Sequence, residues 1–174
     1  PIPVGSATYL GTFYATANGQ TSMQFAPAPA SGGSSNVLGL WNAYNRVAYA
    51  TTEQDLSSTL WSIPATTSMI NNSSAERITF VDGLAQSAVY AGIGWKVFTQ
   101  NNFVALWINE NTTTGEGTLN QAVTSNIDAA TFMNVTQTFT PSLGLNYIQA
   151  MSTSGVNTNQ LLPSNGGMTA TIEM

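Results

Sequence analysis

The sequence predicts an all-β protein, an antiparallel β-sandwich with a jelly-roll-like strand arrangement, in one domain spanning residues 1–174. Three observations lead to this prediction. Apolar residues alternate with polar ones over short stretches, which is the period of a half-buried strand. Turn signals separate these stretches at intervals of roughly 8–12 residues, as in sandwiches and jelly rolls. Gly, Asn, Thr and Ser also recur too often for long helices.

The strands are predicted in chain order, after an N-terminal arm of residues 1–6. Asn18-Gly19 lies between two short apolar runs and predicts a hairpin, because this dipeptide favours tight two-residue turns. Gly92 or Gly94 predicts a bend in a long strand. Residues 152–167 are predicted to form a polar loop. We expect strands over residues 8–15, 21–25, 37–50, 58–63, 77–82, 86–99, 103–109, 132–139, 145–151 and 168–174, with residues 122–130 either a strand or one helical turn.

Residues 37–47 (VLGLWNAYNRV) are the stretch around which the other strands are expected to be arranged. As a single strand it would place alternate side chains on one face. That face changes from apolar to polar towards its end, which is typical of a buried strand whose far end reaches a subunit or ligand boundary. The residues on this face are Leu38, Leu40, Asn42, Tyr44 and Arg46.

The chain contains very few charges. Charged residues make up 6% of it, against about 25% in an ordinary soluble protein. Such a composition is typical of an assembly component whose surface is largely covered or uncharged. With three basic residues and a net charge of −5, no nucleic-acid partner is expected, because sequence-independent binding needs several cations against the phosphates. No run approaches the ~18 apolar residues of a membrane-spanning helix, so no membrane partner is expected.

No catalytic residues, metal site or cofactor are predicted. The chain lacks Cys and His, and so lacks thiolate chemistry, the usual general base and the commonest metal ligand. The eight acids could supply a glycosidase pair, but most fall in predicted loops, strand ends and turns, where solvated surface is the simpler interpretation. A Ser–Lys pair through Lys96, or calcium at Asp82 or Glu116, has little support from spacing. The residues Pro1-Ile2-Pro3-Val4 do not resemble a signal peptide.

Aromatic residues remain as candidates for binding. Core packing is the preferred interpretation for most of them, and for Trp107 above all. The best interface candidates are Trp41, Tyr44, Asn45 and Arg46, because aromatic residues and Arg dominate binding hot spots. Arg46 could pair with a carboxylate of a neighbouring subunit or with one of its own chain. Other aromatics that could stack on sugars or anchor an interface are Tyr49, Trp61, Tyr90, Trp95 and Tyr147.

Four stretches, ATYLGTF (7–13), GQT (19–21), WNAYNRV (41–47) and RITFVDGL (77–84), resemble a group of structural proteins of tailed bacteriophages. The resemblance covers about residues 7 to 90. It implies phage origin and a β-rich building block, and it brings no catalytic residues with it. Together with the low charge, it leads us to expect a non-enzymatic protein on the surface of the phage particle.

The specific expectation is a head decoration (cement) protein that stabilises the capsid through subunit contacts. Its expected partners are copies of itself, as a trimer, and the major capsid protein or another virion protein. The alternative is a tail-fibre module that binds a receptor or a host surface glycan. A hydrolase is a third hypothesis, for which we expect no activity to be found.

Overall fold

The computed structural model describes residues 8–21, 23–24, 36–44, 46–85, 87–100, 103–115, 122–125, 129–156 and 158–174. These residues form strands and one short 3-10 helix, η1 (Ile70–Asn72). The predicted N-terminal arm (1–6) lies outside the described residues, as do residues 27–35 and 101–102.

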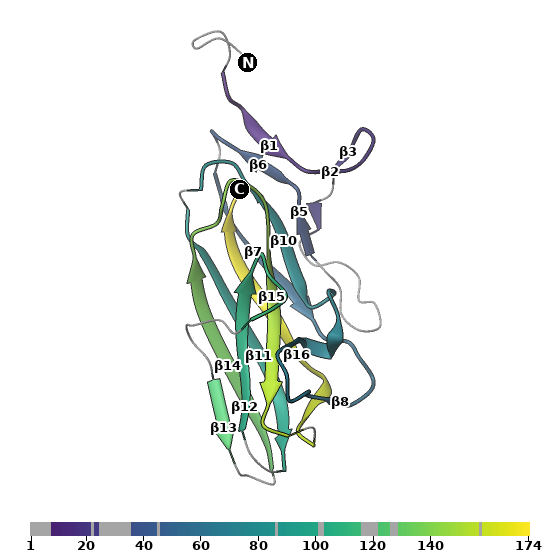
Figure 1. Ribbon diagram of the computed structural model, residues 1–174. Coiled ribbons are helices and arrows are strands. Elements are labelled where there is room, and N and C mark those ends of the chain that lie inside the picture. Colours follow the sequence, from purple (N-terminus) through teal and green to yellow (C-terminus); the bar gives the residue numbers. More distant parts are fainter. Residues whose placement is uncertain are drawn as a thin grey trace.

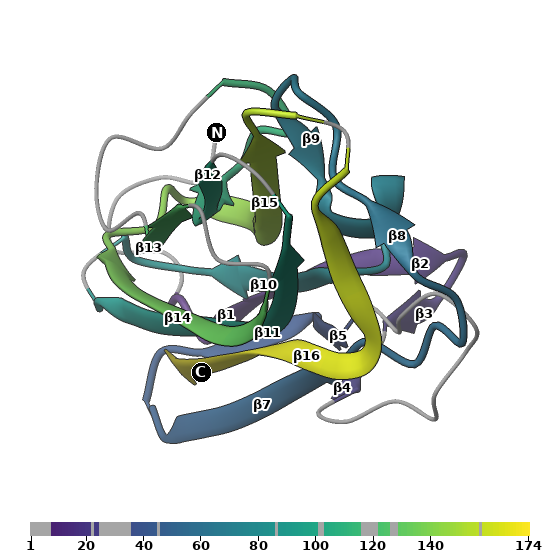
Figure 2. The same ribbon diagram turned by 90° about the horizontal axis from the view of Figure 1, so that it is seen from below.

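Two antiparallel sheets pack face to face (Figures 1 and 2). The first, which we call sheet I, has the order β14-β11-β16-β7, with β14 (Ala129–Phe139), β11 (Val89–Thr99), β16 (Gln160–Glu173) and β7 (Ala48–Gln54). The second, sheet II, contains the order β13-β12-β15-β10, with β13 (Ala122–Ser125), β12 (Phe103–Glu110), β15 (Gly144–Ser154) and β10 (Arg77–Asp82).

The strand order confirms the predicted jelly roll. From β10 onward the chain passes from one sheet to the other at almost every connection, and only β12 and β13 follow each other within a sheet. The neighbours of most strands are therefore distant in sequence, as in the two Greek keys of an eight-stranded jelly roll. The alternation of apolar and polar residues gives each strand one apolar face. In both sheets these faces point inward, so that the two sheets pack as a sandwich.

Sheet II continues past β10. Strand β5 (Asn36–Leu38) pairs with β10 in parallel, and β4 (Met23–Gln24) pairs with β5. Two short strands join the sheets at their margins: β8 (Trp61–Ser62) pairs with β16, and β9 (Ser68–Met69) pairs with β15.

The remaining N-terminal strands lie beside one end of the sandwich (Figure 1). Strand β1 (Gly11–Phe13) pairs with β6 (Leu40–Asn42). Strand β2 (Ala15–Ala17) pairs with β3 (Gln20–Thr21) through the predicted Asn18-Gly19 turn, where Gly19 has a φ of 70°. This hairpin confirms the prediction from the dipeptide, because glycine adopts a positive φ without strain.

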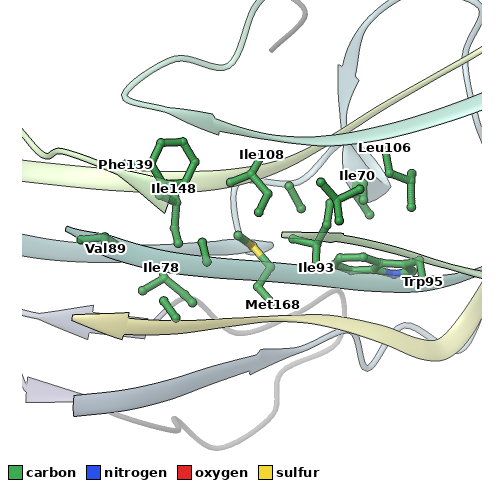
Figure 3. Close-up of a cluster of buried hydrophobic side chains, with 14 of the residues drawn as sticks. Ile70, Ile78, Val89, Ile93, Trp95, Leu106, Ile108, Phe139, Ile148 and Met168 are labelled. Atoms are coloured by element: carbon green, nitrogen blue, oxygen red, sulfur yellow. The ribbon is translucent and has the colours of Figure 1, made fainter. Parts of the chain in front are cut away.

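A large cluster of buried apolar side chains lies between the two sheets (Figure 3). Ile93 and Met168 from sheet I meet Ile78, Ile108 and Ile148 from sheet II. The clean alternation of β11, where every second side chain from Val89 to Thr99 is buried, supplies much of this surface. Trp107 is fully buried in a second cluster with Met151, so the prediction of a packed Trp107 is confirmed.

Several predicted boundaries are wrong, and one expected irregularity lies in another strand. Residues 37–50 are not one strand, because the chain leaves β5 at Gly39, forms β6, and re-enters the sandwich as β7. Residues 152–167 are not a loop: β15 runs on to Ser154 and β16 begins at Gln160. Along β11, Gly92 and Gly94 stay in regular register, and the irregularity lies where β16 passes Trp95, between Gly166 and Leu161.

Candidate functional site

Strands β1 and β6 and the residues beside them carry a cluster of exposed apolar side chains, which we call the β1–β6 patch. Leu10 is 70% exposed, Phe13 67% and Tyr44 68%, with Tyr9 and Leu40 about half exposed beside them. Leu10, Phe13, Leu40 and Tyr44 line a shallow hollow of about 400 Å³. Exposed apolar groups that gather in one place mark an interaction site.

Strand register places two of these apolar groups on one face of the β1–β6 pair. Phe13 lies opposite Leu40, and Thr12 lies opposite Trp41. Because successive side chains of a strand point to opposite faces, Phe13 and Leu40 face solvent together while Trp41 points inward. The two strands approach closely at Gly11, where a Cβ would lie 2.3 Å from the carbonyl oxygen of Trp41.

Trp41 lies beneath the patch and is 1% exposed. Its ring packs over Gly83, where a Cβ would come within 2.1 Å of the ring atom Cε3. Tyr9 stacks against the same ring with centroids 5.9 Å apart, and its hydroxyl donates to the Gly83 carbonyl at 3.5 Å. Trp41 therefore holds the patch in place from below and offers almost no surface to a partner.

The other predicted interface residues are placed differently. Tyr44 is on the surface of the patch, and Asn45 lies outside the described residues. Arg46 is exposed, and its Nη1 donates to the hydroxyl of Ser87 at 3.4 Å. Ser87 in turn donates to the carboxylate of Glu173. The structure thus places Trp41 and Tyr44 in one patch. Arg46 instead contacts Ser87, which links it to Glu173 at the end of β16.

Several acids are buried, contrary to the prediction that most of them are solvated. Glu53 is 1% exposed, Asp55 2%, Glu76 0% and Asp82 5%. Asp55 accepts hydrogen bonds from the indole Nε1 of Trp95 at 3.2 Å and from the backbone of Ser57. Side chains alternate between the two faces of β7, so Glu53 points inward with Thr51, and Asp55, just after the strand, continues the pattern. The alternation was present in the sequence, but acidic residues were not expected to be buried.

Glu76 and Glu53 form a buried pair of carboxyl groups. Burial raises the pKa of Glu76 to about 7; the charge of Asp55 adds to this rise, and hydrogen bonds with Glu53 and Asn71 reduce it. Asn71 Nδ2 donates to Glu76 Oε1 at 3.0 Å. A hydrogen bond that lowers the pKa of Glu76 is one in which Glu53 donates to the Glu76 carboxylate, so that the two carboxyl groups share one charge. Because Glu76 is fully buried, a substrate cannot reach it, and the pair acts on stability.

Two features are not found among the described residues. Within the described ranges, no group of three or more His, Cys, Asp or Glu side chains could hold a metal ion. The same part of the chain contains no helix that is long and apolar enough to span a membrane.

The outward side of sheet I also presents aromatic side chains, and sequence reasoning identified it only in part. Tyr90, named among the aromatics, is 63% exposed, whereas Trp95 is fully buried. Phe132 was not singled out, yet it is 56% exposed. The signal that could have found it is the alternation along β14, which places Phe132 on the face opposite to the buried Met133 and Val135.

The comparisons with known proteins add no assignment to these surfaces: the sequence matches no protein-family model, and a comparison with curated proteins finds no match either.

Proposed function

We propose that this chain is a non-enzymatic structural protein on the exterior of a phage virion, and that its copies associate through the β1–β6 patch. A head decoration (cement) protein, present as a trimer and bound to the major capsid protein or another virion protein, is the specific role proposed. The observation that carries the proposal is the patch itself, an exposed apolar surface on a chain that is almost without charge.

The placement of the sequence resemblance supports this role. Three of the stretches that resemble phage structural proteins come together in the fold, although they are far apart in sequence. Residues 9–13 and 41–44 build the patch, and Gly83 in the third stretch lies under Trp41. A shared sequence pattern that encodes an exposed apolar surface is better explained by a shared contact than by folding alone.

The composition of the patch also suits a subunit contact. Aromatic residues are enriched in the centres of interfaces, and charged residues are depleted there. A specific interface buries ~1,600 Å² in total, so the patch would form the centre of a larger contact.

Light scattering and native mass spectrometry of the chain test this proposal. The unaltered chain is expected to form an oligomer at micromolar concentration, and Leu10→Ser is expected to weaken it. Leu143→Ser is the matched control, because Leu143 is 68% exposed, against 70% for Leu10, and does not line the patch. A chain that is monomeric at micromolar concentration and does not bind phage particles would contradict the proposal.

A map of whole particles by electron cryo-microscopy tests the location. Density for the chain on the head supports the cement role, and density on the tail supports the alternative, a tail-fibre module that binds a receptor or glycan. The exposed aromatics on the outward side of sheet I favour keeping this second candidate.

A further inference from the structure

The outward side of sheet I carries a row of hydroxyl groups across its strands. Gly92 on β11 lies opposite Thr136 on β14 and opposite Thr169 on β16. Thr169 in turn lies opposite Thr52 on β7. Because Gly92 has no side chain, the threonines on its two sides border a low floor at the middle of the sheet.

Phe132 leans over the second glycine of this floor. A Cβ built on Gly94 would lie 2.9 Å from Cε1 and 3.1 Å from Cζ of the Phe132 ring, so the far end of the ring occupies the space above Gly94. The Phe132 side chain is nevertheless 56% exposed. An aromatic ring supported on a glycine and open to water is a surface on which an apolar ligand face can pack.

Two hollows follow this floor and share Thr169. One of about 470 Å³ begins at Tyr90 and is bordered by Thr136, Thr138 and Thr171. The other, of about 350 Å³, includes Phe132 and Gly94. The far end of the Phe132 ring lies at Gly94, four positions from Tyr90 on β11, so the two aromatics mark a track about 13 Å long at ~3.3 Å per residue.

Lys96, the half-buried partner of Phe132 on β11, is a charged residue on the outward side beside the track, but it lines neither hollow. None of the eight described residues that line the larger hollow is charged. Among the ten that line the smaller one, Glu53 alone carries a carboxyl group, and it is 1% exposed. Hydroxyl and amide groups are both donors and acceptors, so this surface can exchange hydrogen bonds with a ligand rich in hydroxyls.

We propose that this track, bounded by Tyr90 and Phe132 on the outward side of sheet I, binds a neutral oligosaccharide. Sugar rings present a face of C–H groups, which packs on an aromatic ring, and a rim of hydroxyls, which matches the threonine row. Because neither hollow is lined by a cation that could pair with a sugar carboxylate, the hollows themselves favour neutral glycans, and the acidic probe tests whether Lys96 beside Phe132 changes this preference. The inference deepens the second candidate function and does not rest on association through the β1–β6 patch.

Calorimetric titration of the full chain tests the proposal. The probes are six-unit oligosaccharides of glucose, of galactose and of N-acetylglucosamine, with an oligogalacturonate of the same length as the acidic comparator. The chain is expected to bind at least one neutral probe and to bind the acidic one more weakly. Phe132→Ala and Tyr90→Ala are each expected to weaken binding about tenfold, because each removes an aromatic contact.

Matched variants separate this surface from the β1–β6 patch. Phe13→Ala and Tyr44→Ala remove the same side chains from positions of similar exposure, 67% and 68%, and should leave glycan binding unchanged. Gly94→Ala should weaken binding less than Phe132→Ala does, because the added methyl displaces the ring without removing it. Circular dichroism of each variant confirms that the fold is retained.

Three results would overturn the inference: no binding of any neutral probe at millimolar concentration, equal binding after Phe132→Ala, or a preference for the acidic probe. Light scattering on the same samples separates the two proposals. Loss of association in Phe132→Ala, with none in Phe13→Ala, would make this track a protein contact and would contradict glycan binding.

Discussion

Two tryptophans, one in the body of the sandwich and one under the β1–β6 patch, are buried in the same way but belong to different surroundings. Each packs on a glycine, Trp95 on Gly166 and Trp41 on Gly83. Trp95 belongs to the large core cluster between the sheets and donates to Asp55. Trp41 belongs to neither core cluster of the described residues, and Tyr9 stacks on its ring.

This difference teaches that the sandwich body is complete by itself, whereas the patch is a thin layer held by one ring. The body buries its large side chains between two sheets. The patch leaves Leu10, Phe13 and Tyr44 exposed to solvent. A layer of this kind gains its remaining burial when a partner covers it. Four predictions test the contrast, in order of expected effect.

Trp95→Ala is expected to have the largest effect. Loss of a fully buried aromatic side chain reduces the free energy of unfolding by about 3–5 kcal/mol, and Asp55 also loses its indole donor. Trp41→Ala should affect mainly the patch: amide exchange should accelerate in β1 and β6 and not in β11. Urea unfolding measures the loss of stability in Trp95→Ala, and hydrogen exchange measures the local effect of Trp41→Ala. Equal acceleration in β11 after Trp41→Ala would show that patch and body form one cooperative unit.

Glu76→Gln tests a polar element that only the body contains. Glu76 has a pKa of about 7 in the folded chain against an ordinary value of 4.5, so the folded state binds more protons than the unfolded state between these values. Stability is therefore highest below pH 4.5 with respect to this group, falls as the pH rises to 7, and is constant above. The total fall is about 3 kcal/mol at most.

Urea unfolding of Glu76→Gln from pH 4.5 to 8 measures this effect. The variant should lose most of the slope and be more stable than the unaltered chain at pH 8. The exposed Glu173 supplies the control, Glu173→Gln, which should keep the slope. An unchanged slope in Glu76→Gln would assign the pH dependence to another group.

Gly83→Ala sharpens the comparison at the base of the patch. The new Cβ would meet the Trp41 ring at 2.1–2.6 Å, so the ring must move, and we expect a loss of about 1–3 kcal/mol. Ala85→Gly, in the same loop, is the comparison variant: Ala85 has a φ of 50°, so glycine should be neutral or slightly stabilising there. Fluorescence of the tryptophans and exchange in β1 report the displacement; unchanged exchange in β1 would show that Trp41 does not hold the patch.

The smallest effect on stability is expected for the exposed patch residues themselves. Leu10→Ser and Leu143→Ser should each stay within about 0.5 kcal/mol of the unaltered chain, because surface substitutions remove little buried contact. Only Leu10→Ser should reduce association. If Leu10→Ser unfolded the chain as Trp95→Ala does, the patch would be part of the core.

The alternating strands could be predicted from the sequence because alternation is a local property. Residues 77–82 became β10 as predicted, and β12 differs from its prediction at one end only. Alternation does not show which partner an inward side chain meets. The carboxyl groups of Glu53 and Glu76 lie against each other in the fold, but the sequence alone led us to interpret both as surface residues. Their burial depends on contacts between strands that are distant in sequence.

The candidate site was predicted only in part for a related reason. The 37–47 stretch was recognised, but its division at Gly39 reverses the faces expected for Leu40 and Trp41. Phe132 and Gly94 come together only because β14 and β11 are neighbours in sheet I. A pairing between strands some 40 positions apart leaves no periodic trace in either segment.

The position of β16 in sheet I has a consequence for the order of folding. It pairs with β11 on one side and with β7 on the other, more than a hundred residues upstream. Until this strand is in place, β7 has no described neighbour in its sheet. Closing so long a loop is slow, so the chain is expected to fold on the millisecond-to-second scale typical of non-local β topologies. On a ribosome, the native sheet can be completed only after nearly the whole domain has been synthesised, and the unfinished half must meanwhile be kept from pairing with other chains.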